Sequence, residues 1–114
     1  MVTKSGATSS RRKSKAAGRK SGNNLLHEIM QYRDQYVIID TASHFIFIGR
    51  LQDSSDHFVT LRDADAHDRR ESPSMNEKYV IDAKKYGVRC NRRCVHIRLE
   101  EVISLSLLDD VIEY

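Results

Sequence analysis

The chain has 114 residues, which is enough for one folded domain and a terminal extension. Its charge is divided unevenly: residues 1–24 carry seven Lys and Arg and no acid, whereas residues 25–114 carry 12 Lys and Arg against 16 acids, a formal charge of −4. No apolar run is long enough to cross a bilayer or to form the core of a secretory signal, so we expect neither a membrane span nor a signal peptide.

Residues 1–24 are predicted to form a disordered basic tail. Their apolar content is one Met, one Val and three Ala, too little to offset the entropy lost on ordering. Such a tail is attracted to polyanions, chiefly nucleic acid, although a solubilising extension, a nuclear-import signal and a membrane-surface segment are alternatives. The candidate nucleic-acid contacts in the tail are Arg11, Arg12, Lys13, Lys15, Arg19 and Lys20.

A short amphipathic helix is predicted after the tail. Asn23 and Asn24 are good N-cap residues, and the segment LLHEIMQYRDQ follows them. Its apolar residues at positions 25, 26, 29 and 30 fall near one helical stripe, which indicates a helix of about ten residues with one face to cover.

From Tyr36 onward the pattern changes to a period of two with many β-branched and aromatic residues. The expected extended segments are YVIID (36–40), HFIFIGRLQD (44–53), DHFVTLRDAD (56–65), a fourth stretch EKYVIDAKKYGVRC (77–90), NRRCVHIR (91–98) and EEVISLSLL (100–108). Tight polar separators and the absence of helical crossovers predict an antiparallel sheet.

Residues 45–48, FIFI, are apolar on both faces of their strand, and Gly49 follows at a point where a barrel strand can bend sharply. We therefore expect a mainly β fold in residues 25–114, a small five-stranded antiparallel barrel with a short N-terminal helix. An open sheet covered by one helix is the alternative.

Two short stretches, which contain Gly49-Arg50-Leu51 and Ile97-Arg98-Leu99, resemble motifs of the Sm and LSm family of small RNA-binding barrels. The first family motif is echoed by residues 37–39, Gly49-Arg50-Leu51, Asp53 or Asp56, and residues 58–61; the second, built on Ile-Arg-Gly, is echoed by Ile97-Arg98-Leu99-Glu100-Glu101-Val102. Leu99 stands where the family has Gly, and Phe58-Val59 stand about where it has Met-Asn.

The resemblance implies an oligomeric barrel that binds single-stranded RNA. Arg98 would then lie on the corner between the fourth and fifth strands, facing the pore of a subunit ring, and His57 is the nearest residue to stack on a base. A guanidinium can stack on a base and bond a phosphate, which suits that role. The departures from the motifs, and the net acidic charge of residues 25–114, favour the alternative of a protein-interaction or scaffold module without an RNA site.

The densest basic region of the folded part surrounds Tyr86. Stacking on the tyrosine and phosphate contacts from the cations would suit RNA, whereas a strand end with solvated side chains is the alternative. The residues in question are Lys84, Lys85, Tyr86, Arg92 and Arg93.

Metal and catalytic chemistry find less support in the sequence. Asp63, Asp65 and His67 would share one face of a continuous strand and offer divalent-metal ligands, but acids at a solvated strand end are the simpler interpretation. Cys90 and Cys94 lack the second pair that a zinc site needs, so we expect free thiols in a reduced, cytoplasmic protein. No nucleophile–base set or Gly-rich phosphate loop stands out, so we expect neither an enzyme nor a cofactor.

Overall fold

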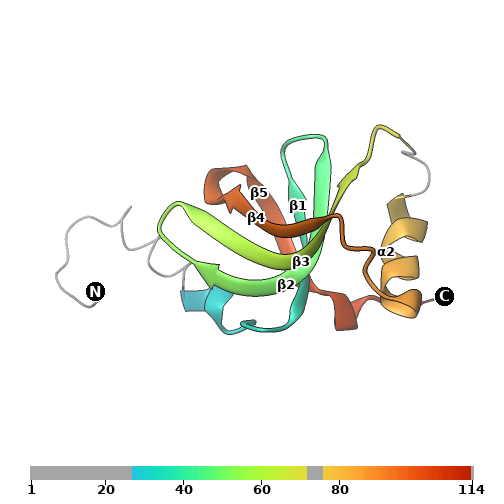
Figure 1. Ribbon diagram of the computed structural model, residues 1–114, viewed down its shortest axis with the longest axis horizontal. Coiled ribbons are helices and arrows are strands. Elements are labelled where there is room, and N and C mark those ends of the chain that lie inside the picture. The colour runs from blue at the N-terminus through green and yellow to red at the C-terminus, as the bar shows by residue number, and fades with distance from the viewer. Residues whose placement is uncertain (1–26, 72–75, 114) are drawn as a thin grey trace, which may run out of the picture.

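Over the residues that the structure describes, five antiparallel strands form a sheet, and the helix α2 is inserted between the third and fourth strands (Figure 1). The computed structural model describes residues 27–71 and 76–113. The elements are β1 (Tyr36–Thr41), β2 (Phe45–Ser54), β3 (Phe58–Asp68), α2 (Asn76–Tyr86), β4 (Arg92–Arg98), the 3₁₀ turn η2 (Leu99–Glu101), β5 (Val102–Leu107) and the 3₁₀ turn η3 (Leu108–Asp110).

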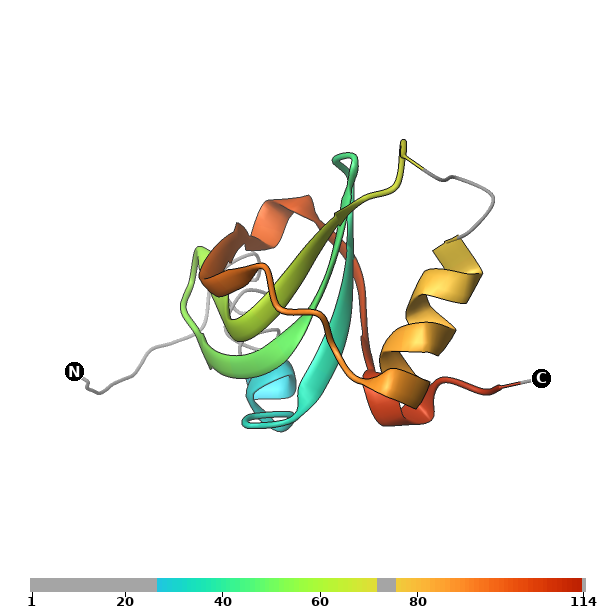
Figure 2. The same ribbon diagram turned by 45° about the vertical axis from the view of Figure 1, so that its right-hand side comes forward.

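The strands form one sheet in the order β4-β3-β2-β1-β5, so the last two strands are its edges, joined by η2. Every neighbouring pair is antiparallel. The sheet curls strongly around its inner face (Figures 1 and 2). The predicted mainly β, five-stranded antiparallel architecture is thus confirmed.

One of the register shifts of the sheet lies at Gly49, where the sequence predicted a bend. The β2–β3 register shifts between Ile48 and Arg50, and Asp63 on the facing strand has φ 50°. A Cβ on Gly49 would lie 2.8 Å from the Cβ of Ala64, so only glycine allows the two backbones to approach this closely. The resulting bulge turns both strands and helps to curl the sheet.

The inner face of the sheet carries the main core. Residues from β1, β2, β3 and β4 pack there with the segment before β1, and part-buried residues of β5 close the cluster. Its buried members are Ile29, Val37, Ile39, Leu51, Val59, Leu61, Ala64 and Ile97.

A second apolar cluster lies on the other face of the sheet, beneath α2. Ile46 and Ile48 of β2 are buried there together with Ala83 of the helix and Leu108 of η3. Figure 2 shows the helix beside the C-terminal segment of the chain. In the FIFI run, the two isoleucines are thus buried on the outer face under α2, whereas Phe47 packs, partly buried, against the inner core.

The prediction of an extended segment over 77–90 was wrong, because residues 76–86 form α2. The run Tyr79-Val80-Ile81 has high β propensity, yet Glu77 in the first turn and two lysines in the last complement the helix dipole. Gly87, at φ 98°, ends the helix, and its N–H bonds the carbonyl of Ala83 at 3.0 Å.

Part of the predicted N-terminal helix is present, because residues 27–30 are helical and Ile29 and Tyr32 pack on the inner core. The N-cap residues and the basic tail of residues 1–24 lie outside the described residues. Among the residues that are described, no helix is long and apolar enough to cross a membrane.

Candidate nucleic-acid interface

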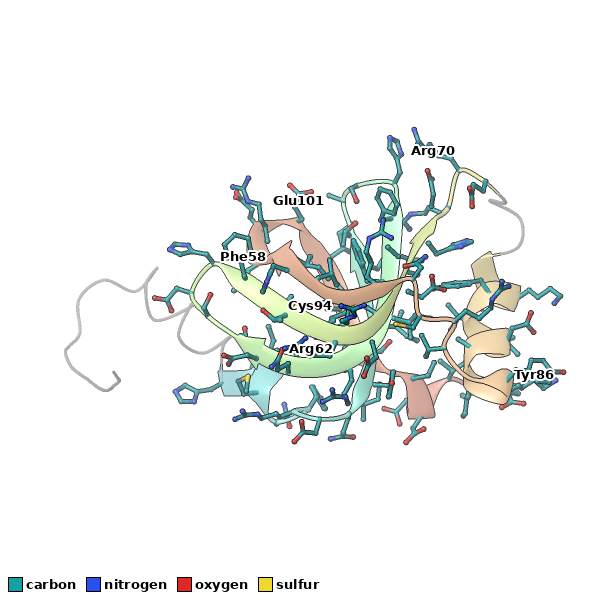
Figure 3. The ribbon with its side chains drawn as sticks, viewed as in Figure 1. Phe58, Arg62, Arg70, Tyr86, Cys94 and Glu101 are labelled. Atoms are coloured by element: carbon teal, nitrogen blue, oxygen red, sulfur yellow. The ribbon has the colours of Figure 1, made fainter. Side chains whose placement is uncertain are left out.

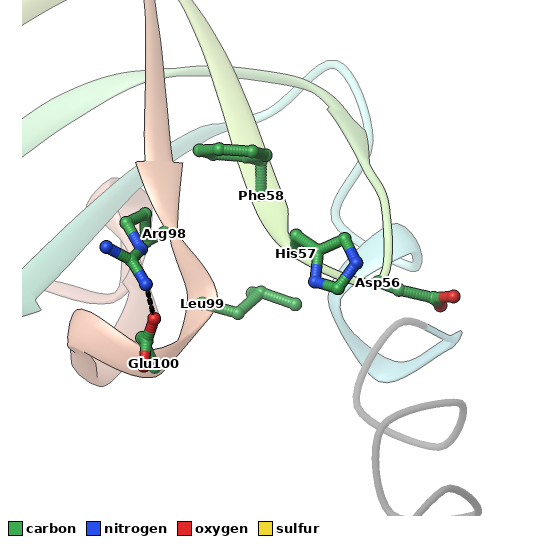
Figure 4. A pocket seen from close by; sticks show the side chains of 6 residues that line it. All are labelled: Asp56, His57, Phe58, Arg98, Leu99 and Glu100. Carbon is green, nitrogen blue, oxygen red and sulfur yellow. Dashed lines mark hydrogen bonds and ion pairs between the residues drawn. The ribbon is translucent and has the colours of Figure 1, made fainter.

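An open depression of about 510 Å³ lies where the β2–β3 turn meets the end of β4 (Figure 4). Two segments far apart in the sequence line it. The lining residues are Asp56, His57 and Phe58 from the turn and Arg98, Leu99 and Glu100 from the corner before β5. The two residues that the motif resemblance selected, His57 and Arg98, therefore belong to one site.

Backbone pairing fixes the two sides of the depression together. Phe58 lies opposite Arg98 in the β3–β4 register, and the N–H of Leu99 bonds the carbonyl of His57 at 2.8 Å. The turn itself is held by Ser55, whose hydroxyl accepts from the N–H groups of His57 and Phe58 at 3.3 and 3.1 Å. The site is consequently built on ladder geometry rather than on a free loop.

The depression offers an aromatic face, an imidazole and a guanidinium. The residue Phe58 is 42% exposed, a large apolar surface for a strand residue to leave in water. Its ring meets the His96 ring edge-on at a centroid distance of 6.3 Å. Exposed aromatic rings beside cations are what unpaired bases stack on.

Arg98 bonds Glu100 across the turn η2 (Figure 4). Both side chains of this ion pair are more than 60% exposed, so the pair contributes little to stability and is easily exchanged for another anion. The charged kink in the sequence is thus a 3₁₀ turn whose glutamate neutralises the arginine beside it. Neither this pairing nor the exposed ring of Phe58 in the depression was predicted from the sequence, in which Phe58 stands only at a motif position.

The basic region around Tyr86 lies away from this depression, at the opposite end of the molecule (Figure 3). Tyr86 is 79% exposed at the end of α2, and Lys85 is exposed beside it. Lys84 is engaged, since its ammonium donates to the carbonyl oxygens of Asp109, at 3.0 Å, and Val111. Arg92 and Arg93 are exposed at the start of β4, whereas Arg98 lies at its end.

The three candidate metal ligands of β3 are not gathered. Asp63 interrupts the strand alternation and lies 3.5 Å from Arg50, whereas Asp65 accepts a 2.8 Å bond from the Tyr79 hydroxyl. His67 stacks on the Tyr79 ring at 4.0 Å. Over the described ranges, no group of three His, Cys, Asp or Glu is placed to hold a metal ion.

Comparison with known proteins gives one kind of match. No family model matches the chain, and no curated protein matches it. Among solved structures, it is similar to an Sm protein of Pyrococcus abyssii, whose structure is a complex with a uridine heptamer. The two share 22% identity over 75% of this chain and 94% of that chain, with a TM-score of 0.48.

Proposed function

We propose that this chain is a single-stranded RNA-binding barrel that receives a base in the depression between the β2–β3 turn and the β4–β5 corner. The observation that carries the proposal is the joining of His57, Phe58 and Arg98 around one open site by ladder pairing. The ring of Phe58 supplies a stacking surface, and Arg98 supplies a donor for phosphate or base edges once Glu100 releases it.

Two further features support the proposal. The seven cations of residues 1–24 add affinity for phosphate without regard to sequence, and that affinity weakens as salt is raised. Ile103, Ser104 and Ser106 of the edge strand β5 are exposed, and an edge strand of this kind suits pairing with a second copy, so we propose a homo-oligomer. The two free thiols agree with a cytoplasmic location.

Fluorescence anisotropy with a labelled single-stranded RNA of about ten nucleotides tests the proposal. Losing one base-stacking ring costs about 1–3 kcal/mol, so Phe58→Ala should weaken binding at least fivefold. Arg98→Gln should weaken it similarly. Glu100→Gln should strengthen it, because it frees the guanidinium. Arg70→Gln is the matched control: Arg70 is also an exposed, acid-paired arginine, but it lies just beyond the far end of β3 from Phe58.

A second variant separates the tail from the depression. Replacing the six candidate tail residues by Gln should lower affinity and flatten its salt dependence while leaving the effect of Phe58→Ala intact. Binding that disappears with the tail charges and ignores Phe58, Arg98 and Glu100 would overturn the proposed site.

The alternative function is a protein-interaction module without an RNA site. Two acids, Asp56 and Glu100, on the rim of the depression favour it, because they repel phosphate. This alternative predicts that Phe58→Ala and Glu100→Gln leave RNA affinity unchanged.

A further inference from the structure

Three side chains on β3 and β4 form a connected cluster: Thr60, Cys94 and His96. The register places Thr60 opposite His96, and the Thr60 Oγ1 atom lies 2.8 Å from His96 Nδ1. Cys94 precedes His96 by two residues, so both point to the same side of β4. The Cys94 Sγ lies 3.9 Å from His96 Nε2, within reach of a thiol hydrogen bond.

The two contacts of the imidazole use different nitrogens. When Nδ1 carries the proton and donates it to the Thr60 hydroxyl, Nε2 is left as an acceptor directed at the thiol. A nucleophile, a base and a third group that orients the base form the arrangement by which proteins activate thiols and hydroxyls. Thr60 here is the orienting group.

A cationic side chain lies on the strand beside Cys94. Arg62 is its direct cross-strand partner, and the two lie on neighbouring strands in Figure 3. The guanidinium donates through Nε to the neutral Gln52 at 2.9 Å, and among the described residues it has no ion-pair partner that would cancel its charge. Cys94 is partly exposed, so a small reagent can reach it. Reactive cysteines occupy partly exposed, electropositive positions of this kind.

The chain also contains its own comparison thiol. Cys90 is exposed, and its Sγ lies 3.3 Å from the carbonyl oxygen of Arg92. A carbonyl accepts a hydrogen bond but does not take up the proton, so this thiol lacks a base in the described surroundings. Exposure alone would make Cys90 the more reactive of the two.

We propose that Cys94 is a reactive thiol, activated by His96 and Thr60, that exchanges with low-molecular-weight disulfides and becomes reversibly thiolated. The Sγ proton passes to His96 Nε2, and the thiolate attacks one sulfur of the disulfide. A new Sγ–S bond forms as the original S–S bond breaks, and its electron pair leaves with the second sulfur. The released thiolate takes the proton from the imidazolium. Cys94 is thereby oxidised to a mixed disulfide while half of the reagent is reduced to a thiol.

Alkylation of the full chain with limiting iodoacetamide, followed by mass spectrometry of the two cysteine peptides, tests the activation. At pH 7 an unactivated thiol is only a few per cent ionised, so Cys94 should react at least about fivefold faster than Cys90. His96→Gln, which keeps a polar side chain but cannot act as the base, should abolish that advantage at pH 7. At pH 10, where thiols ionise unaided, the variant should react like the wild type.

Matched variants separate activation from a change of structure. Thr60→Val should slow Cys94 at pH 7, and Thr60→Ser, which restores the hydroxyl, should recover the rate. His44→Gln alters an exposed histidine of the β1–β2 turn and should change neither cysteine. In every variant the Cys90 rate is the internal reference for folding and reagent access.

Oxidised glutathione then tests the exchange itself. The mixed disulfide should appear first on the peptide that contains Cys94 and should vanish on adding dithiothreitol. A wild-type Cys90 that reacts as fast as Cys94 at pH 7, or a Cys94 rate that does not respond to His96→Gln, overturns the proposal.

Discussion

At Gly49 a missing side chain decides how closely β2 and β3 approach each other. An added Cβ would meet the Ala64 Cβ at 2.8 Å and the Ala64 Cα at 3.1 Å, and part of that contact is backbone, which cannot rotate away. The glycine is therefore needed for the curvature of the sheet and not for the conformation of a loop.

Gly49→Ala should destabilise the fold by about 1–3 kcal/mol, the usual cost of overpacking. Urea unfolding followed by circular dichroism measures the change. Ala64→Gly should recover part of the loss when it is combined with Gly49→Ala, because it removes the colliding atom. Additive effects in this double-mutant cycle would show that the two residues do not compete for the same space.

Tyr79 links α2 to the outer side of β3 through its bond to Asp65 and its stack on His67. Burial, followed by the hydrogen bond to Asp65, raises the pKa of the Tyr79 hydroxyl above its ordinary value near 10. The folded state thus holds this proton more tightly than the unfolded state does. The resulting stabilisation is complete below pH 10 and is lost as the pH rises further toward the raised pKa.

Tyr79→Phe should accordingly cost about 1 kcal/mol near pH 7 through the lost bond to Asp65. The difference in unfolding free energy between wild type and variant should shrink as the pH rises above 10, by at most about 1.4 kcal/mol per pH unit. Urea titrations of both proteins between pH 7 and 11 measure it, and the remaining lysines and tyrosines cancel in the comparison. A gap that widens with pH would contradict the assigned sign.

Among the elements, α2 shows where sequence patterns were informative and where they failed. The strands were predicted because alternation over residues 36–68 and 92–107 reports a sheet with one face in the core. The segment Tyr79-Val80-Ile81 reads equally well as a strand, and only its ends, Glu77 and Gly87, indicated a helix. This segment forms a helix because it packs on the apolar outer face of β2, and such a tertiary contact cannot be read from the local sequence pattern.

Ala83 is the test residue for that packing, since it is 7% exposed between α2 and the strands. Ala83→Asp should destabilise the protein by about 2–4 kcal/mol, because it buries a carboxylate without a partner. Lys78→Gln on the exposed side of the same helix should shift the thermal midpoint little. Calorimetry of the two variants side by side measures the difference, and equal midpoints would mean that the helix does not pack as described.

For the candidate site, motif spacing was enough to select His57 and Arg98 but not their neighbours. Phe58 and Glu100 are brought beside them by the β3–β4 register and the 3₁₀ turn, which no local pattern specifies. Of the cluster of Thr60, Cys94 and His96, the sequence indicates only one pair, because Cys94 and His96 lie two residues apart on one predicted strand. Thr60 precedes its partner His96 by 36 positions in the chain, so this contact depends on long-range strand pairing.

For the molecule as a whole, the two edge strands of the sheet, β4 and β5, determine whether it can associate with a second copy. β5 pairs with β1 on one side, while Ile103 on its exposed surface is 65% accessible. Charges on an edge strand oppose pairing with another chain. If the proposed homo-oligomer uses this edge, Ile103→Lys should lower the mass measured by native mass spectrometry and leave the thermal unfolding of the subunit nearly unchanged. Tyr86→Lys, which places the same charge at another exposed apolar side chain, is the control. An assembly unaltered by Ile103→Lys would exclude β5 as the contact.

The insertion of α2 between β3 and β4 has a consequence for how the protein reaches its native state. β1, β2 and β3 are joined by short turns, so their pairing is local in the sequence. The pairing of β4 with β3, in contrast, must close the long connection of residues 69–91. Strand pairings that close long loops form slowly, because the conformational entropy of the loop is lost before the contacts between the strands form. We therefore expect the β2–β3 turn and the end of β4, which line the depression, to come together late in folding, after the first three strands have paired.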